Sequence, residues 1–219
     1  MKQSTLKMIL TIGACVLLGI LLAMIVTLNI AAMEKDVEPK KEEEPKWIDI
    51  DRQFLTKNEY SRPGEKLSEV NGIVIHYVCN PGSSAQANRD YFELLKDTKN
   101  RYASSHFIVG LEGEIIQCIP LREIAYASNS RNDDTISIEC CHPDDTGEFN
   151  VFTYESTVKL AAHLCNVYNL EPKDIIRHYD VTKKECPKYF VDHKDAWKQF
   201  KKDVKEAMEE EIAFNQKQN

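Results

Sequence analysis

The stretch GIVIHYV, residues 72–78, carries the clearest information about the fold. It is β-branched and apolar on both faces, which is the pattern of a strand buried in the middle of a sheet. Strand alternation places His76 on the same face as Val74 and Val78. The stretch therefore predicts a central strand that carries a histidine near its end.

Segments with helix and strand patterns alternate after this strand. Residues 83–98 begin with serine caps and continue with apolar side chains at helical spacing, so they predict a helix. Residues 106–119 contain two apolar runs joined at LEGE and predict a hairpin. TISIEC, residues 135–140, alternates cleanly and predicts a strand with Glu139 on its polar face.

Two further helices are expected in the C-terminal part. One begins at a Thr153 cap and carries an apolar stripe that reaches Tyr168, and the short apolar run DIIRH, residues 174–178, follows it. The last helix covers residues 193–208. Strands and helices interleave, which predicts an α/β domain with a mixed central β-sheet flanked by helices.

The N-terminal segment indicates where this domain works. Residues 8–33 contain no charged side chain, and 26 residues at about 1.5 Å each exceed the roughly 30 Å of a bilayer core. Basic residues precede this span and acidic ones follow it, so the positive-inside rule places the later part outside the cell. We expect a cytoplasmic N-terminus at 1–7, one transmembrane helix at 8–33, a charged linker at 34–46 and an extracellular domain at 47–219. A cleaved signal peptide, which would release a secreted domain, is the alternative.

The charge balance argues against nucleic-acid binding. Removing Lys2 and Lys7 from the 28 basic residues leaves 26 outside the membrane against 35 acidic ones, a net charge of −9. A chain of this charge would not be held by a polyanionic surface. We therefore expect no nucleic-acid partner, and membrane attachment through residues 8–33.

The cysteines of the outer part are even in number. They are Cys79, Cys118, Cys140, Cys141, Cys165 and Cys186. An even count allows disulfides, whereas the lack of CxxC pairs and the abundance of apolar residues favour buried thiols. The sequence leaves their pairing open.

Three side chains have the character of a catalytic zinc site, which uses three protein ligands and keeps one position open. His76 ends a predicted strand, His178 ends DIIRH, and Cys186 follows in the next loop. Strand ends are where sites usually form on such sheets. Each histidine alone is also compatible with a hydrogen-bonded core residue. The alternative donors that spacing leaves open are Asp180, His106 and His142.

Four ordered motifs together resemble a known family. They are IVIHYV (73–78), SSHFIVGLEGEIIQCIP (104–120), DTISIEC (134–140) and RHYDVTKKECPKYF (177–190). In this order they are similar to the zinc-dependent N-acetylmuramoyl-L-alanine amidases of the phage-lysozyme and peptidoglycan-recognition-protein group, the type 2 amidases. The resemblance covers roughly residues 70–200.

The resemblance implies one zinc ion per chain and a set of site residues. The implied metal ligands are His76, His178 and Cys186. Glu139 would act as general base and Lys184 would stabilise the oxyanion. Some family members use a tyrosine at the position that Ser105 occupies here, so this chain is similar to the members that use glutamate. Without the order of the motifs, the preferred interpretation would be a solvated carboxylate on an exposed strand face for Glu139 and an ordinary surface lysine for Lys184.

The implied reaction is zinc-dependent hydrolysis of the amide bond between N-acetylmuramic acid and L-alanine in peptidoglycan. Residues 126–132, YASNSRN, are candidates for the peptide groove, with a plain polar loop as the alternative. Other functions to weigh are a non-catalytic peptidoglycan-binding module, a thiol-dependent wall peptidase using Cys79 or Cys186, and a cytosolic recycling amidase. The presence of Cys186 favours hydrolysis over binding alone, and the apolar span argues against the cytosolic enzyme.

Overall fold

The computed structural model of the chain describes Met24 and residues 46–218. The predicted cytoplasmic N-terminus, membrane anchor and linker lie outside the described residues, apart from Met24 and Lys46. Within the described part, no helix is both long and apolar enough to cross a membrane. The chain divides into two units, Met1–Pro45 and Lys46–Asn219, and the second unit contains the sheet and the candidate ligands.

A mixed sheet with the strand order β1-β4-β3-β5-β2-β6 forms the centre of this unit. The strand bounds are Asp51–Arg52 (β1), Gly72–Tyr77 (β2), Phe107–Val109 (β3), Ile115–Gln117 (β4), Thr135–Cys140 (β5) and Ile175–Arg177 (β6). β3 and β4 pair antiparallel, as the predicted hairpin requires, and the other neighbouring pairs of the described sheet are parallel. β2 lies between β5 and β6, as its apolar character on both faces predicts.

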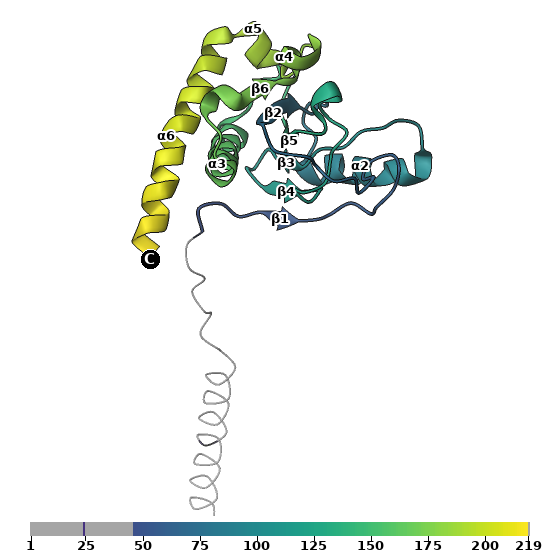
Figure 1. Cartoon of the computed structure of the whole chain (residues 1–219), viewed down its shortest axis with the longest axis horizontal. Helices are drawn as coiled ribbons and strands as arrows, with labels where there is room; N and C mark the ends of the chain where they lie inside the picture. Colours follow the sequence, from purple (N-terminus) through teal and green to yellow (C-terminus); the bar gives the residue numbers. More distant parts are fainter. Residues whose placement is uncertain (1–23, 25–45, 219) are drawn as a thin grey trace, which may run out of the picture. The chain divides into compact units, whose positions relative to one another are not determined.

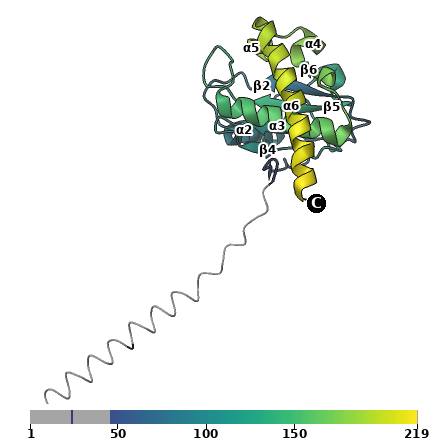
Figure 2. The same ribbon diagram turned by 90° about the vertical axis from the view of Figure 1, so that its left-hand side faces the viewer.

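Helices cover both faces of the sheet, which confirms the predicted α/β architecture. Their bounds are Ala85–Thr98 (α2), Val151–Tyr168 (α3), His178–Thr182 (α4), Lys188–Asp192 (α5) and Lys194–Gln218 (α6), with 3-10 turns at Asn129–Arg131 (η1) and Pro172–Asp174 (η2). Figure 1 shows α3 and α6 side by side against one face of the sheet and α2 on the other. In Figure 2, α6 runs across the front of α3.

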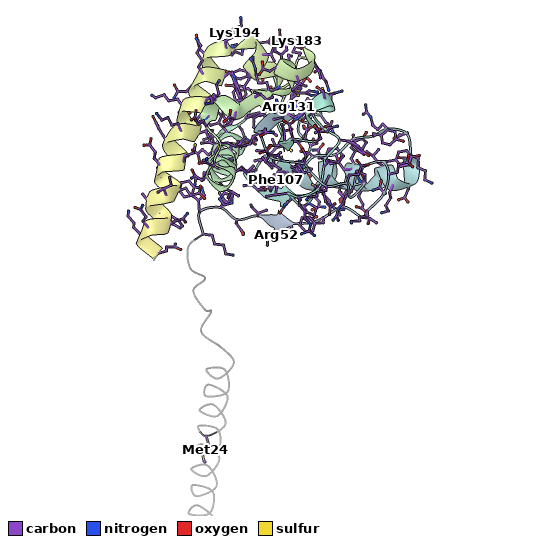
Figure 3. The ribbon with its side chains drawn as sticks, viewed as in Figure 1. Met24, Arg52, Phe107, Arg131, Lys183 and Lys194 are labelled. Atoms are coloured by element: carbon purple, nitrogen blue, oxygen red, sulfur yellow. The ribbon has the colours of Figure 1, made fainter. Side chains whose placement is uncertain are left out.

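Strand alternation divides the core into two layers. Ile75 of β2 and Ile138 of β5 join the cluster that packs under α3 and α6, together with Phe107, which Figure 3 labels in the middle of the sheet. Ile108 of β3 belongs instead to the cluster under α2. Because neighbouring side chains in a strand point to opposite faces, His76 and Glu139 lie on the face away from α3 and α6.

The start of α2 agrees with the sequence prediction, whereas the start of α3 does not. The Ser84 side chain accepts the Ala87 N–H at 3.2 Å and caps α2. The predicted Thr153 cap is wrong, because α3 begins two residues earlier and Asn150 Oδ1 accepts the Thr153 N–H at 2.9 Å. Thr153 is buried, and its hydroxyl donates to the Gly110 carbonyl at 2.8 Å. It therefore fastens α3 to the β3–β4 hairpin.

The last helix continues past its predicted end at residue 208. Beyond that point Glu211 is buried, with one carboxylate oxygen 2.6 Å from His163 Nδ1 and the other accepting from Asn166 at 2.8 Å. A buried carboxylate needs such partners, and here α3 supplies both of them. These polar contacts hold α6 against α3 beyond residue 208, and the helix ends at Gln218.

The cysteines of the described residues are all free thiols. Cys79 is exposed, and the others are buried. The fold therefore uses most of them as small apolar side chains, without disulfides among the described residues.

Candidate active site

The candidate site lies at the carboxyl ends of three adjacent parallel strands. His76 in β2 and Glu139 in β5 are direct register partners, one residue before the end of each strand. His178 follows β6 immediately and is the first residue of α4. Cys186 lies in the loop between α4 and α5. The parallel arrangement gathers side chains from distant parts of the chain at one edge, where sites form in such sheets.

The histidines and the cysteine form one compact group. Their donor atoms lie within 4.8 Å of one another, and this is the group in the described residues that could hold a metal ion. His76 Nδ1 is 3.8 Å from Cys186 Sγ, and the rings of His76 and His178 lie 4.7 Å apart between centroids. All three side chains are buried. The structure thus brings together the three residues that the sequence singled out.

The alternative donors have other partners. Asp180 pairs with Arg177 at 2.7 Å and closes the first turn of α4. His106 Nε2 lies 2.9 Å from the carbonyl of Glu123. His142 Nδ1 lies 2.7 Å from the carbonyl of Asp144. None of the three belongs to the group formed by His76, His178 and Cys186.

The donor set fits zinc. Two imidazoles and a thiolate at zinc bond lengths of about 2.0 and 2.3 Å place nitrogen and sulfur roughly 3.5 Å apart in a tetrahedron, near the observed 3.8 Å. Burial raises the pKa of the Cys186 thiol to about 12, so a thiolate here requires a cation beside it. Glu139 Oε2 is buried and has no hydrogen-bond partner among the described residues. A buried oxygen without a partner, on a carboxyl group whose Oε1 lies 4.0 Å from His76 Nδ1, suits a site completed by a metal ion and a reactant.

Electrostatics keep both histidines in the form that binds metals. Burial lowers the pKa of His76 well below its ordinary value, and the charges of His178 and Lys184 lower it further. Burial followed by the charge of Lys184 also lowers the pKa of His178. Neutral imidazole is the ligand form. The 4.0 Å approach of His76 Nδ1 to Glu139 Oε1 therefore joins a neutral ring to a carboxyl group.

Glu139 has the properties of a general base. Burial raises its pKa to about 8, and the positive charge of Lys184 opposes this rise. A catalytic base works best when its pKa lies near the working pH. Its side chain is 17% exposed, so the residue is largely enclosed beside the group.

Lys184 lies on the exposed rim of the site. It is in the loop that leads from α4 to Cys186, and its charge acts on His76, His178 and Glu139. A mobile cation at this position is available to a developing negative charge.

A groove of about 650 Å³ opens beside His178. Its cationic side chains are Arg101, Lys183 and Lys184, and it also contains Tyr102 and Tyr126. None of the described residues that line it is acidic. Figure 3 labels Arg131 of η1 and Lys183, the C-cap of α4, and these two elements are in contact. The groove is therefore a positively charged and partly aromatic surface on a chain whose net charge is −7.

Two residues of the segment 126–132 have a role that sequence reasoning missed. Ser128 Oγ lies 3.2 Å from His76 Nε2, and Asn129 Oδ1 lies 2.9 Å from His178 Nε2. The segment does line the groove, through Tyr126, Ala127, Asn129 and Asn132. Nothing in the local sequence indicates the histidine contacts, because they join positions 52 and 49 residues apart.

Ser105 occupies a structural position. It is buried, and its hydroxyl lies 3.0 Å from the carbonyl oxygens of both Phe107 and Ser137. These contacts tie β3 to β5 on the side of the sheet away from α3. The hydroxyl is therefore engaged with the backbone rather than with the histidines.

A mixed α/β sheet with a buried His–His–Cys group, a neighbouring carboxyl group and an open groove is typical of metal-dependent hydrolases. The sequence profile of the Amidase_2 family, described as N-acetylmuramoyl-L-alanine amidase, matches residues 66–189. The chain belongs to this family.

Curated relatives carry the same description. The chain is 36% identical over 176 residues to the N-acetylmuramoyl-L-alanine amidase BlyA of Bacillus subtilis (strain 168), covering 71% of this chain and 46% of that protein. It is 35% identical over 170 residues to the N-acetylmuramoyl-L-alanine amidase CwlL of Bacillus licheniformis, covering 72% of this chain and 47% of that protein. The chain thus spans about half the length of these relatives.

Solved structures support the fold. The catalytic domain of XlyA is 26% identical, with a TM-score of 0.61, and the match covers 72% of this chain and 99% of that one. PlyL, at 22% identity and a TM-score of 0.62, shows the same fold over 72% of this chain and 97% of its own.

Proposed function

We propose that this chain is a zinc-dependent amidase that hydrolyses the bond between N-acetylmuramic acid and L-alanine in peptidoglycan. One observation carries the proposal. The donor atoms of His76, His178 and Cys186 lie within 4.8 Å of one another, beside Glu139, in a chain of the N-acetylmuramoyl-L-alanine amidase family. The names of the curated relatives support the same bond.

The proposed roles follow from position and charge. His76, His178 and Cys186 would hold the metal, and a zinc ion held there supplies a Lewis acid for the amide carbonyl. Glu139 takes a proton from the attacking water and returns it to the departing amine, because its carboxyl group lies beside the ligands. Lys184 stabilises the negative charge that develops on the carbonyl oxygen.

The groove suits a peptide that carries carboxylates. Arg101 and Lys183 provide positive charge beside the site, and no acidic lining residue would repel an anion. Tyr102 and Tyr126 pack edge to face at 5.6 Å and offer ring surfaces for the sugar or the peptide backbone. We expect the stem peptide to lie here, with its L-alanine end at Glu139.

A thiol-dependent peptidase fits less well. The pKa of the Cys186 thiol is raised to about 12, so without a metal it carries almost no thiolate at neutral pH. Cys79 is exposed, but it is not part of the His–His–Cys group. A module that only binds peptidoglycan is also less well supported, because the chain retains every donor of the group as well as Glu139.

We further propose that residues 8–33 anchor the chain in the cell membrane by a single span, with the amidase domain outside the cell. The support is the uncharged 26-residue run with lysines before it and acidic residues after it. Protease treatment of intact cells tests this proposal. Loss of the domain without lysis supports an outward orientation, and full protection contradicts it.

The activity is tested by incubating purified peptidoglycan with the full chain and identifying the products by mass spectrometry. The proposal expects free lactyl carboxyl groups on muramic acid together with new L-alanine amino termini. Cleavage within the peptide would overturn it in favour of a peptidase, and binding without cleavage in favour of the binding module.

A further inference from the structure

One short segment, residues 128–129, contacts the Nε2 atoms of both histidines of the site. Ser128 Oγ is 3.2 Å from His76 Nε2, and Asn129 Oδ1 is 2.9 Å from His178 Nε2. We propose that Ser128 and Asn129 are positioning residues: each fixes the orientation of one imidazole, and Asn129 also fixes the tautomer of His178, so that both rings present Nδ1 to the metal. This inference rests on the proposed zinc site, and it gives these two residues a role at the histidines that is separate from lining the groove.

The geometry at His178 requires a particular tautomer. An amide oxygen only accepts hydrogen bonds, so Asn129 Oδ1 at 2.9 Å requires the proton of His178 on Nε2. The lone pair of the neutral ring is then on Nδ1. Histidine ligands generally donate their second N–H in this way, which sets the tautomer and raises the basicity of the nitrogen that binds the metal.

The geometry at His76 leads to the same arrangement. Its Nδ1 is the nitrogen that faces the site, 3.8 Å from Cys186 Sγ and 4.0 Å from Glu139 Oε1. Its Nε2 therefore points away from the site toward the Ser128 hydroxyl, which is buried and able to accept a hydrogen bond from the Nε2–H. One pair of adjacent residues thus serves two proposed ligands, one in β2 and one at the start of α4.

The segment is built to hold this position. Asn132 Oδ1 accepts the N–H groups of both Ala127 and Ser128, at 3.1 and 2.6 Å. Arg131 forms an ion pair with Asp134 at 2.7 Å, just before β5 begins. These contacts fix the segment to the strand that carries Glu139, and η1 also contacts α4, which His178 begins. A rigid support of this kind is what precise ligand placement needs.

The backbone at Asn129 makes a clean test possible. Its φ is 53°, in the left-handed region where glycine is favoured and asparagine is tolerated. Asn129→Gly therefore removes the side chain without straining the backbone. Asn169, the C-cap of α3, has a φ of 54° and an exposed side chain away from the site. Asn169→Gly is thus the same chemical change at the same backbone conformation.

The first measurement is the tautomer of His178 in the metal-free full chain, solubilised in detergent micelles. Long-range nitrogen–proton NMR spectra at about pH 8, above the ordinary histidine pKa of about 6.5, identify the protonated nitrogen. His178→Gln assigns the signals. We expect the proton on Nε2 almost entirely in the unaltered chain, and a measurably smaller Nε2 fraction after Asn129→Gly. A proton on Nδ1 in the unaltered chain would overturn the proposal without any variant having to fold.

The second measurement is the affinity for Zn²⁺ alone, by competition with a chromogenic chelator. Loss of a hydrogen-bond partner behind a ligand generally weakens metal binding by about 10- to 100-fold, and we expect this of Asn129→Gly and of Ser128→Ala. Asn129→Asp keeps an accepting oxygen and should restore the affinity. Asn169→Gly should bind as the unaltered chain does. Equal affinity of Asn129→Gly and Asn169→Gly would refute the role.

These readouts separate this inference from the proposed function. A chain that binds Zn²⁺ with the expected tautomer but cleaves no peptidoglycan supports the positioning role and contradicts the amidase. A chain that cleaves peptidoglycan while Asn129→Gly retains its metal affinity contradicts the positioning role alone.

Discussion

His76 and Glu139 are register partners in the parallel strands β2 and β5, and their side chains approach to 4.0 Å between Nδ1 and Oε1. The proposed ligand and the proposed base are thereby fixed on one rigid pair of strands. Sites built on strands hold their geometry more precisely than sites on loops. Strand pairing thus sets the distance between the proposed ligand His76 and the proposed base, whereas His178 and Cys186 come from the elements that follow β6.

Glu139→Gln should abolish most of the turnover and leave metal binding intact. The amide is nearly isosteric with the carboxyl group but cannot accept the proton of water, and general-base catalysis generally contributes about 10²- to 10⁴-fold. The measurements are the release of new amino termini from peptidoglycan and the zinc content of the variant. Glu112→Gln, at an exposed position away from the site, is the control. Near-normal turnover of the Glu139 variant would remove its assigned role.

Lys184→Gln and Lys183→Gln should affect different kinetic constants. Lys184 acts electrostatically on His76, His178 and Glu139, so its loss should lower kcat by about 10²- to 10³-fold, as for other oxyanion donors. Lys183 lines the groove and should mainly raise KM. Steady-state kinetics on a soluble muramyl peptide separate the two. If both variants change only KM, Lys184 contributes to binding and not to the transition state.

Removal of the metal should stop the reaction reversibly. A chelator should abolish turnover and added Zn²⁺ should restore it, since the group of His76, His178 and Cys186 would otherwise lack its Lewis acid. Cys186→Ser should lose zinc, whereas Cys118→Ser, an equally buried thiol outside the group, should keep it. Cys79→Ser should remain active. Inactivation by the Cys79 change together with resistance to chelators would favour the thiol peptidase.

The sequence predicted those parts of the structure that depend on local pattern. The strand at residues 135–140 and the Ser84 cap follow from alternation and from hydrogen-bonding chemistry within a few residues. The cap of α3 was misassigned because Asn150 and Thr153 are both good cap residues. The burial of Thr153 against the hairpin, which decides between them, is a tertiary contact.

The candidate ligands were predictable for a different reason. His76, His178 and Cys186 were found through the order of four motifs, and spacing alone left Asp180 and His106 as rivals. The contacts of Ser128 and Asn129 could not be read from one sequence, because they depend on how η1 folds back over the strand ends. The short strand β1 also carries no pattern of its own and forms by pairing with β4.

His106 should make the fold sensitive to mild acid. Its Nδ1 accepts the Ser137 N–H at 3.1 Å, and its Nε2 faces the Glu123 carbonyl at 2.9 Å, so the pair of contacts suits the neutral ring. Burial lowers the pKa of His106 to about 4, although the hydrogen bond to the Glu123 carbonyl opposes this shift.

The direction of the pH dependence follows from that lowered pKa. Below about pH 6.5, His106 is protonated in the unfolded chain but stays neutral in the folded chain. The unfolded state therefore binds more protons, and the free energy of unfolding falls as the pH falls. The loss should reach about 2 kcal/mol at pH 5 and about 3 kcal/mol below pH 4. His76 and His178 also have lowered pKa values, so they add to the loss in the metal-free chain.

Chemical denaturation of His106→Gln and of the unaltered chain, both metal-free, at several pH values isolates the contribution of His106. The difference between the two unfolding free energies should shrink by about 2 kcal/mol between pH 7.5 and pH 5. A constant difference for His106→Gln would mean that the buried ring takes up a proton as readily as the unfolded one.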